Sequence, residues 1–136
     1  MSRFKMLDHP ADGRIRIHGA TPGELFNEGL EGLYSLMEVP FGERKGATSM
    51  TLRAASYEEL LVALLGEALF RATSHKTGLR TIGISVRPNK KERMLQGSFE
   101  TYALGEAGRE VKAVTFHRLR IRQRGGGWTA SVIFDL

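Results

Sequence analysis

The residues best suited to chemistry form a short turn near the start of the sequence, Leu7-Asp8-His9-Pro10-Ala11-Asp12-Gly13. Two carboxylates and one imidazole within five residues could bind a metal or transfer protons. Alternatively, the aspartates could cap backbone N–H groups in an ordinary turn. The turn is too short to form a site alone, so a site here needs a partner from elsewhere in the chain.

The best candidate partner lies at the other end of the sequence, in Ile133-Phe134-Asp135-Leu136. Along residues 128–134 every second side chain is apolar, which places Asp135 on the opposite, polar face of a strand. We expect the two ends to meet in space. Asp12, Asp135 and the carboxyl group of Leu136 would then form an all-oxygen cluster, which suits a hard divalent cation such as calcium, magnesium or manganese.

Arginines form a second candidate surface, at every second position in Arg118, Arg120, Arg122 and Arg124. On one face of a strand these side chains could contact the phosphates of RNA, or a partner protein. Alternatively, they form a solvated stripe that discourages edge-to-edge aggregation of sheets. His117 falls on the opposite, apolar face, where a hydrogen-bonded core histidine is a commoner arrangement than a metal ligand.

Composition limits the classes of protein that the chain can be. Its 136 residues, 41% of them hydrophobic, suit a single domain over residues 1–136 with one sizeable core. No apolar run approaches the roughly 18 residues of a membrane span, and no signal peptide is visible. Cysteine is absent, which excludes disulfides and thiolate chemistry and fits a reducing cytoplasm.

Charge is spread unevenly along the chain, whose formal net charge is +5. Residues 1–75 hold 8 Lys and Arg against 10 Asp and Glu, whereas residues 76–124 hold 12 against 4. A basic half of this kind favours contact with nucleic acid or with an acidic protein. The simpler alternative is a solvated basic surface.

Two helices are predicted from their start signals. Thr21-Pro22-Gly23-Glu24 and Ser56-Tyr57-Glu58-Glu59 are both capping boxes. The first helix is expected to end near Val39-Pro40 and the second before His75. Because the second helix is apolar around much of its circumference, we expect it to be the most buried element.

The remaining segments alternate in polarity and predict strands, with loops at 40–47 and 105–108. The expected strands are 3–7, 14–18, 48–54, 81–87, 94–104, 110–123 and 127–135. Gly125-Gly126 predicts a tight hairpin in which Leu119 faces Val132 and His117 faces Phe134. The expected fold is α+β, with two layers: an antiparallel-rich mixed β-sheet with two helices packed on one face.

Several motifs, in this order and spacing, resemble the archease family over nearly the whole chain. They are Leu7 to Gly13, Glu24-Leu25-Phe26, Glu59-Leu60-Leu61, Val111 to His117 and Trp128 to Leu136. The resemblance implies a chaperone-like two-layer fold. It also places the family's metal-binding aspartates on Asp12 and Asp135, and matches Asp8, His9, Lys112 and His117 to positions with supporting roles.

The function implied by this resemblance is that of an accessory protein, not an enzyme. Archeases assist the GTP-dependent RNA ligase of tRNA splicing and RNA repair, by promoting its guanylylation and its repeated turnover. The expected cofactor is a divalent metal. The expected partners are the ligase and, in addition, tRNA. The alternative function is an RNA-binding or chaperone-like module that acts through the basic strand face.

Overall fold

The computed structural model describes the backbone of residues 4–7 and 12–136, and the side chains from Gly13 onward. Its elements, in chain order, are β1 (Phe4–Leu7), β2 (Asp12–Gly19), α1 (Pro22–Met37), β3 (Phe41–Ala54), α2 (Tyr57–His75), β4 (Thr77–Asn89), β5 (Glu92–Leu104), β6 (Ala113–Thr115), β7 (Arg122–Arg124) and β8 (Gly127–Asp135). In these ranges, no helix has the length and apolarity to cross a lipid bilayer.

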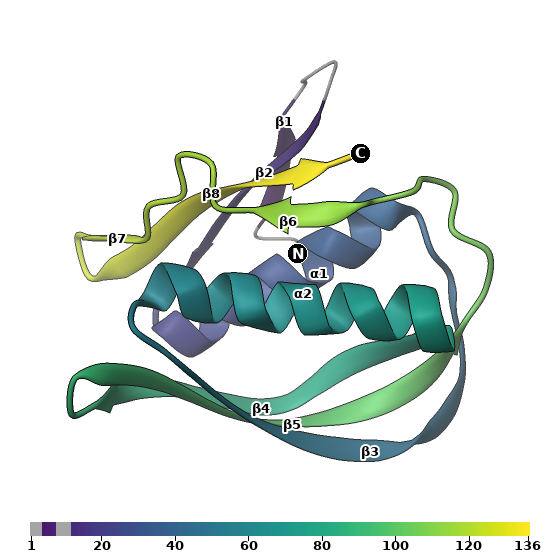
Figure 1. Cartoon of the computed structure of the whole chain (residues 1–136), viewed down its shortest axis with the longest axis horizontal. Coiled ribbons are helices and arrows are strands. Elements are labelled where there is room, and N and C mark those ends of the chain that lie inside the picture. Colours follow the sequence, from purple (N-terminus) through teal and green to yellow (C-terminus); the bar gives the residue numbers. More distant parts are fainter. Residues whose placement is uncertain (1–3, 8–11) are drawn as a thin grey trace.

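The two helices lie between two antiparallel sheets (Figure 1). One sheet has the order β1-β2-β8-β6, with β7 also paired to β8, and the other has the order β3-β5-β4. The α+β class with two helices is therefore confirmed, but the strands divide into two sheets where one was expected. The reason is the second helix. Since α2 buries Leu60, Leu61, Leu64, Leu65, Ala68, Leu69 and Ala72, one sheet cannot cover it.

Both helices begin at the predicted capping residues. Thr21 Oγ1 accepts a hydrogen bond from the Glu24 backbone N–H at 3.1 Å, and Ser56 Oγ accepts one from Glu59 at 3.1 Å. These bonds satisfy N–H groups that have no partner within a first helical turn. The predicted helix starts are therefore confirmed.

The predicted loop at 40–47 is wrong, because β3 already begins at Phe41. Its first residues pair with the end of β5 through two register shifts, between Phe41 and Arg44 and between Arg44 and Gly46. These irregularities interrupt the regular alternation of side chains. A simple periodicity therefore could not identify the first half of the strand.

The predicted strand 110–123 is also wrong, because it is broken into β6 and β7. Near the hairpin the predicted register holds, with Arg124 opposite Gly127 and Arg122 opposite Thr129. Further on, Thr115 lies opposite Ile133, so seven steps along one strand match only four along β8. The extra residues form a turn closed by a hydrogen bond from the Leu119 N–H to the Phe116 carbonyl oxygen at 3.0 Å.

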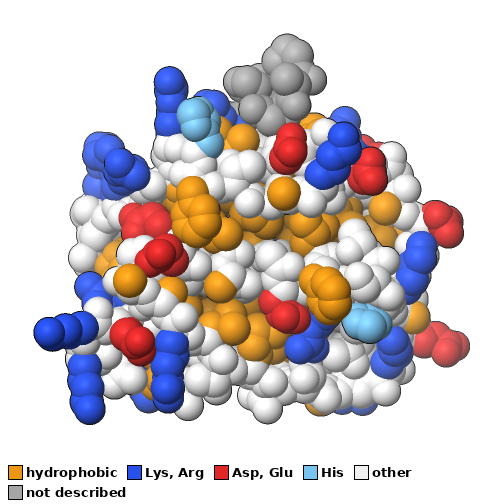
Figure 2. All heavy atoms as spheres, viewed as in Figure 1, with side chains coloured by type: hydrophobic (Ala, Val, Ile, Leu, Met, Phe, Trp, Pro, Cys, Tyr) orange, Lys and Arg blue, Asp and Glu red, His pale blue; other side chains and the backbone are white. Residues whose placement is uncertain are grey.

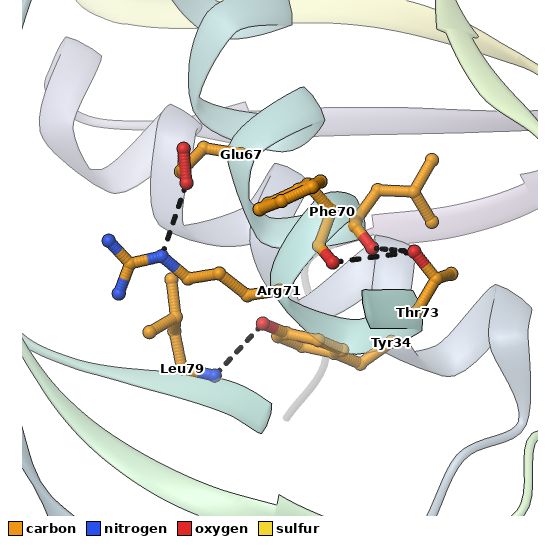
Figure 3. Close-up of polar contacts among 7 residues, drawn as sticks. Tyr34, Glu67, Phe70, Arg71, Thr73 and Leu79 are labelled. Carbon is orange, nitrogen blue, oxygen red and sulfur yellow. Dashed lines mark hydrogen bonds and ion pairs between the residues drawn. The ribbon is translucent and has the colours of Figure 1, made fainter. Parts of the chain in front are cut away.

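A buried tyrosine connects the first helix to the three-stranded sheet (Figure 3). Tyr34 of α1 is 5% exposed, and its hydroxyl oxygen accepts a hydrogen bond from the Leu79 backbone N–H at 2.9 Å. Burial raises the pKa of Tyr34 to about 12, and the Leu79 hydrogen bond opposes that rise. The phenol is therefore neutral throughout the physiological pH range.

Candidate functional site

The two ends of the sequence lie side by side in the five-stranded sheet (Figure 1). β2 pairs along its whole length with residues 128–135 of β8, with Asp12 opposite Asp135 and Gly13 opposite Phe134. Directly opposed residues of an antiparallel pair lie with their Cα atoms about 4.5–5.5 Å apart. The expectation that the two ends meet is therefore met at the level of the backbone register.

Packing against the core fixes the orientation of β8. Ala130, Val132 and Phe134 belong to the buried core, whereas Ile133 is buried outside that core and Asp135 is exposed. The apolar side chains face the helices, so Asp135 lies on the outer face of the sheet, as predicted. Its carboxylate is thus accessible to solvent and to a cation.

Close packing holds the end of β8 against the first helix. A Cβ atom added to Gly13 would come within 2.8 Å of Leu36 Cδ2 and 3.4 Å of Leu136 Cδ2. The glycine therefore leaves the space that both leucine side chains occupy. The packed side chain of Leu136 thus anchors the chain directly after Asp135.

The backbone of Lys112 also contacts the end of β8. Its N–H donates a hydrogen bond to the Asp135 carbonyl oxygen at 2.7 Å, while its side chain is exposed. The structure thus brings the backbones of Asp12, Lys112 and Asp135 together. Asp8 and His9, the other residues of the opening turn, lie outside the described residues.

The predicted donor set for a metal consists of Asp12, Asp135 and the carboxyl group of Leu136. Among side chains 13–136, no group of three His, Asp or Glu residues could hold a metal ion. Of the predicted donor set, the structure shows the backbones of Asp12 and Asp135 opposite each other in the ladder, and the metal centre stays a prediction. Two aspartates supply oxygen donors of the kind that hard cations prefer.

His117 does not lie where the sequence predicts it. It is exposed in the turn between β6 and β7, and its backbone N–H donates to Thr115 Oγ1 at 3.3 Å. It lies opposite no residue of β8, because the ladder skips this part of the chain. The prediction that His117 faces Phe134 on the apolar side is wrong, and the physical reason is the turn itself.

The same turn gathers the predicted arginines around a hollow of about 200 Å³. Arg118, Arg120 and Arg122 line it together with Arg16 of β2, and Thr129, Ala130 and Ser131 of β8 form the rest of its wall. Arg124 is absent from the lining. We call this feature the arginine hollow. Arg16 is not among the residues predicted from the sequence, although alternation along the expected strand 14–18 assigns it to a polar face.

A second hollow, of about 360 Å³ and mostly apolar, lies between α2 and β6. Its lining includes Val62, Gly66, Phe70, Lys112 and Val114. Phe70 is 54% exposed. Figure 2 shows hydrophobic side chains across the middle of this face, with Lys and Arg side chains mostly around its edge.

Comparison with known proteins assigns the fold and the family. A solution structure of Methanobacterium thermoautotrophicum protein 1598 is similar to the whole chain, with a TM-score of 0.80 and 24% identity over 100% of both chains. The crystal structure of a Thermotoga maritima protein described as an archease, possible chaperone, has a TM-score of 0.68 and 20% identity. It covers 97% of this chain and 96% of its own. These two likenesses support the fold.

Sequence relatives agree over the same length. The archease of Thermococcus gammatolerans is 30% identical over 144 residues, covering 100% of both chains, and that of Methanosarcina barkeri is 27% identical, covering 98% of this chain and 96% of its own. The family model of the Archease protein family (MTH1598/TM1083) matches residues 4–136, which span both the Asp12–Asp135 pair and the arginine hollow. The chain therefore belongs to the archease family.

Proposed function

We propose that this archease is an accessory protein of the GTP-dependent RNA ligase that acts in tRNA splicing and RNA repair in the cytoplasm. It promotes guanylylation of the ligase and its repeated turnover, and does not itself join RNA. The observation that carries the proposal is the opposition of Asp12 and Asp135 across β2 and β8. It is the arrangement that the resemblance to archeases requires of their metal-binding aspartates.

The two aspartates would hold a divalent cation at the end of the five-stranded sheet. Calcium, magnesium and manganese all accept carboxylate oxygens, and the carboxyl group of Leu136 would complete the set predicted from the sequence. A bound cation of this kind supplies positive charge that neutralises carboxylate or phosphate oxygens. Packing of Leu136 beside Gly13 limits the movement of Asp135 relative to β2.

Ligase turnover with and without the archease tests this function. GTP, metal and a broken RNA are supplied in excess over the ligase, and the joined RNA is counted per ligase molecule. We expect stimulation by the wild-type archease and at least a tenfold loss of it in Asp12→Ala and Asp135→Ala. Glu92→Ala, which removes an exposed carboxylate from the three-stranded sheet, is the matched control.

Two results would contradict the proposal. Absence of stimulation by the wild-type protein would exclude the ligase as its partner. Full stimulation by both aspartate variants would exclude a role for the metal and leave the ligase partnership in place. Crystals soaked in manganese give an independent reading, because anomalous scattering between Asp12 and Asp135 marks the ion directly.

A second candidate function is binding of RNA through the basic face of the five-stranded sheet. The observation that favours it is the convergence of four arginines on one hollow. It requires neither the ligase nor a metal. It can therefore hold whether or not the first proposal does.

A further inference from the structure

The arginine hollow lies where β8 lacks a paired strand along one edge, the edge opposite β2. β7 pairs with residues 127–129 of β8 and β6 with residues 133–135, and neither pairs with residues 130–132. The connecting segment of residues 116–121 turns away from the ladder at this gap. Thr129, Ala130 and Ser131 form the wall of the hollow beside the gap.

Two separate parts of the chain supply the positive charge. Arg16 lies directly opposite Ser131 in the ladder of β2 and β8, Arg118 lies in the turn, and Arg120 and Arg122 follow it. The guanidinium of Arg120 donates to the Leu119 carbonyl oxygen at 3.0 Å. This hydrogen bond limits the orientations open to one of the four cations.

Among the described residues that line the hollow, no carboxylate balances this charge. The lining contains neither Asp nor Glu, and within the part of the chain that the structure describes none of the four arginines forms an ion pair. Like charges gathered at one place repel one another. An anion in the hollow would relieve that repulsion.

Arg118 is held in a backbone conformation that suits glycine. Its φ is +54°, in the left-handed region, at the third position of the Phe116–Leu119 turn. A side chain with a Cβ atom is strained in this region. Strained residues gather at functional sites, so an arginine here points to a ligand that uses its charge.

From these features we infer that the arginine hollow binds two or more consecutive phosphates of a single-stranded RNA. Guanidinium groups match phosphate oxygens with two parallel N–H donors, and the Thr129 and Ser131 hydroxyls can add neutral donors. Each phosphodiester carries a single negative charge, so four arginines match several phosphates in a row better than one.

Basic residues continue along the strands beyond the hollow and support an extended strand as the ligand. His18 follows Arg16 at the next outward position of β2, and Arg124 follows Arg122 in β7; both are exposed. A free phosphate or nucleotide would leave these groups unused. The choice of RNA as the strand rests on the proposed function, whereas the binding of consecutive phosphates does not.

Binding of a fluorescent 12-nucleotide RNA to the archease alone, in EDTA, tests the inference. We expect Arg120→Gln/Arg122→Gln to weaken binding at least tenfold. Arg53→Gln/Arg87→Gln is the matched control, because it removes two exposed arginines that flank Met94 in the three-stranded sheet. We expect the control to bind within about twofold of wild type.

Salt dependence and a turn variant make the test specific. Loss of two phosphate contacts should make the slope of log K against log salt shallower by about 1.4, since each contact on a single strand contributes about 0.7. Arg118→Gly should weaken binding and make the slope shallower by about 0.7, without lowering the melting temperature. This last result separates loss of binding from loss of folding.

Three results would overturn the inference: equal weakening by the control pair, an unchanged salt slope in the hollow variants, or binding of inorganic triphosphate as tight as that of the RNA. Because neither ligase nor metal is present, failure here leaves the proposed ligase function untouched. Equally, a failure of ligase stimulation leaves this binding test unaffected.

Discussion

Asp12 in β2 and Asp135 in β8 are directly opposite partners in one antiparallel ladder, although they come from opposite ends of the sequence. Like charges at directly opposed positions destabilise a sheet. From this register we expect two charged carboxylates to weaken the sheet and a bound cation to offset that effect. This relationship gives a prediction about stability that needs no ligase.

Asp135→Asn should raise stability without metal and abolish stabilisation by metal. In EDTA we expect the free energy of unfolding to rise by up to about 1 kcal/mol, because the like-charge repulsion is removed. With manganese or calcium at a hundred times its dissociation constant, the wild type should gain about 2.7 kcal/mol and the variant far less. Urea unfolding with each metal measures both effects, and a variant that keeps the full gain would exclude Asp135 as a ligand.

Tyr34→Phe should destabilise the protein by about 1–3 kcal/mol at neutral pH. The Leu79 N–H, which donates to Tyr34 at 2.9 Å, would be left buried without an acceptor. Chemical denaturation at pH 7 measures the loss. An unchanged stability would mean that water reaches this N–H.

The same tyrosine should make stability fall at high pH. Since burial raises its pKa to about 12, above the ordinary value of 10, the folded state retains the proton that the unfolded state loses. Stability from this group is complete below pH 10 and falls by up to about 1.4 kcal/mol per pH unit between pH 10 and 12. Tyr34→Phe should lack this part of the fall, which denaturation at a series of pH values would show.

Arg118→Gly should be more stable than Arg118→Ala by about 1–2 kcal/mol. Both variants remove the same charge, but only glycine relieves the strain of a left-handed backbone at φ +54°. Thermal unfolding of the two variants side by side measures the difference. Equal stabilities would show that the turn adopts another conformation in solution.

Two glycines should respond in opposite directions to substitution by alanine. A Cβ atom at Gly66, in the middle of α2, meets no atom within 4 Å, so Gly66→Ala should stabilise by about 0.5–1 kcal/mol. A Cβ atom at Gly19 would come within 2.6 Å of the Leu25 backbone nitrogen, so Gly19→Ala should destabilise. Melting temperatures of the two variants measure both effects, and only Gly19→Ala tests the packing around the start of α1.

Glu58→Gln should speed hydrogen exchange at one amide in the segment before β7. The Glu58 carboxylate accepts a hydrogen bond from the Ile121 backbone N–H at 2.9 Å and so ties α2 to this segment. A neutral amide oxygen is a weaker acceptor than a carboxylate. Exchange at Ile121, measured by NMR against that at Leu79, should rise selectively; equal protection in variant and wild type would contradict the bond.

Local features of the sequence were enough to determine the helices and the outward position of Asp135. Thr21 and Ser56 cap their helices through contacts three residues away, and alternation along 128–135 assigns each side chain to a face. Gly125 and Gly126, both with positive φ, form the predicted hairpin. Each of these features depends on neighbours within a few residues, which is why it could be predicted from the sequence.

Long-range pairing was decided only by the tertiary structure. Which residue of β8 lies opposite Asp12 depends on how β2 and β8 align, and α2 needed a second sheet to cover it. The break at residues 116–121 leaves the alternating pattern intact while it removes His117 from the core and draws Arg118 toward Arg16. Periodicity identifies the faces of strands, but it does not contain the register between segments far apart in the chain.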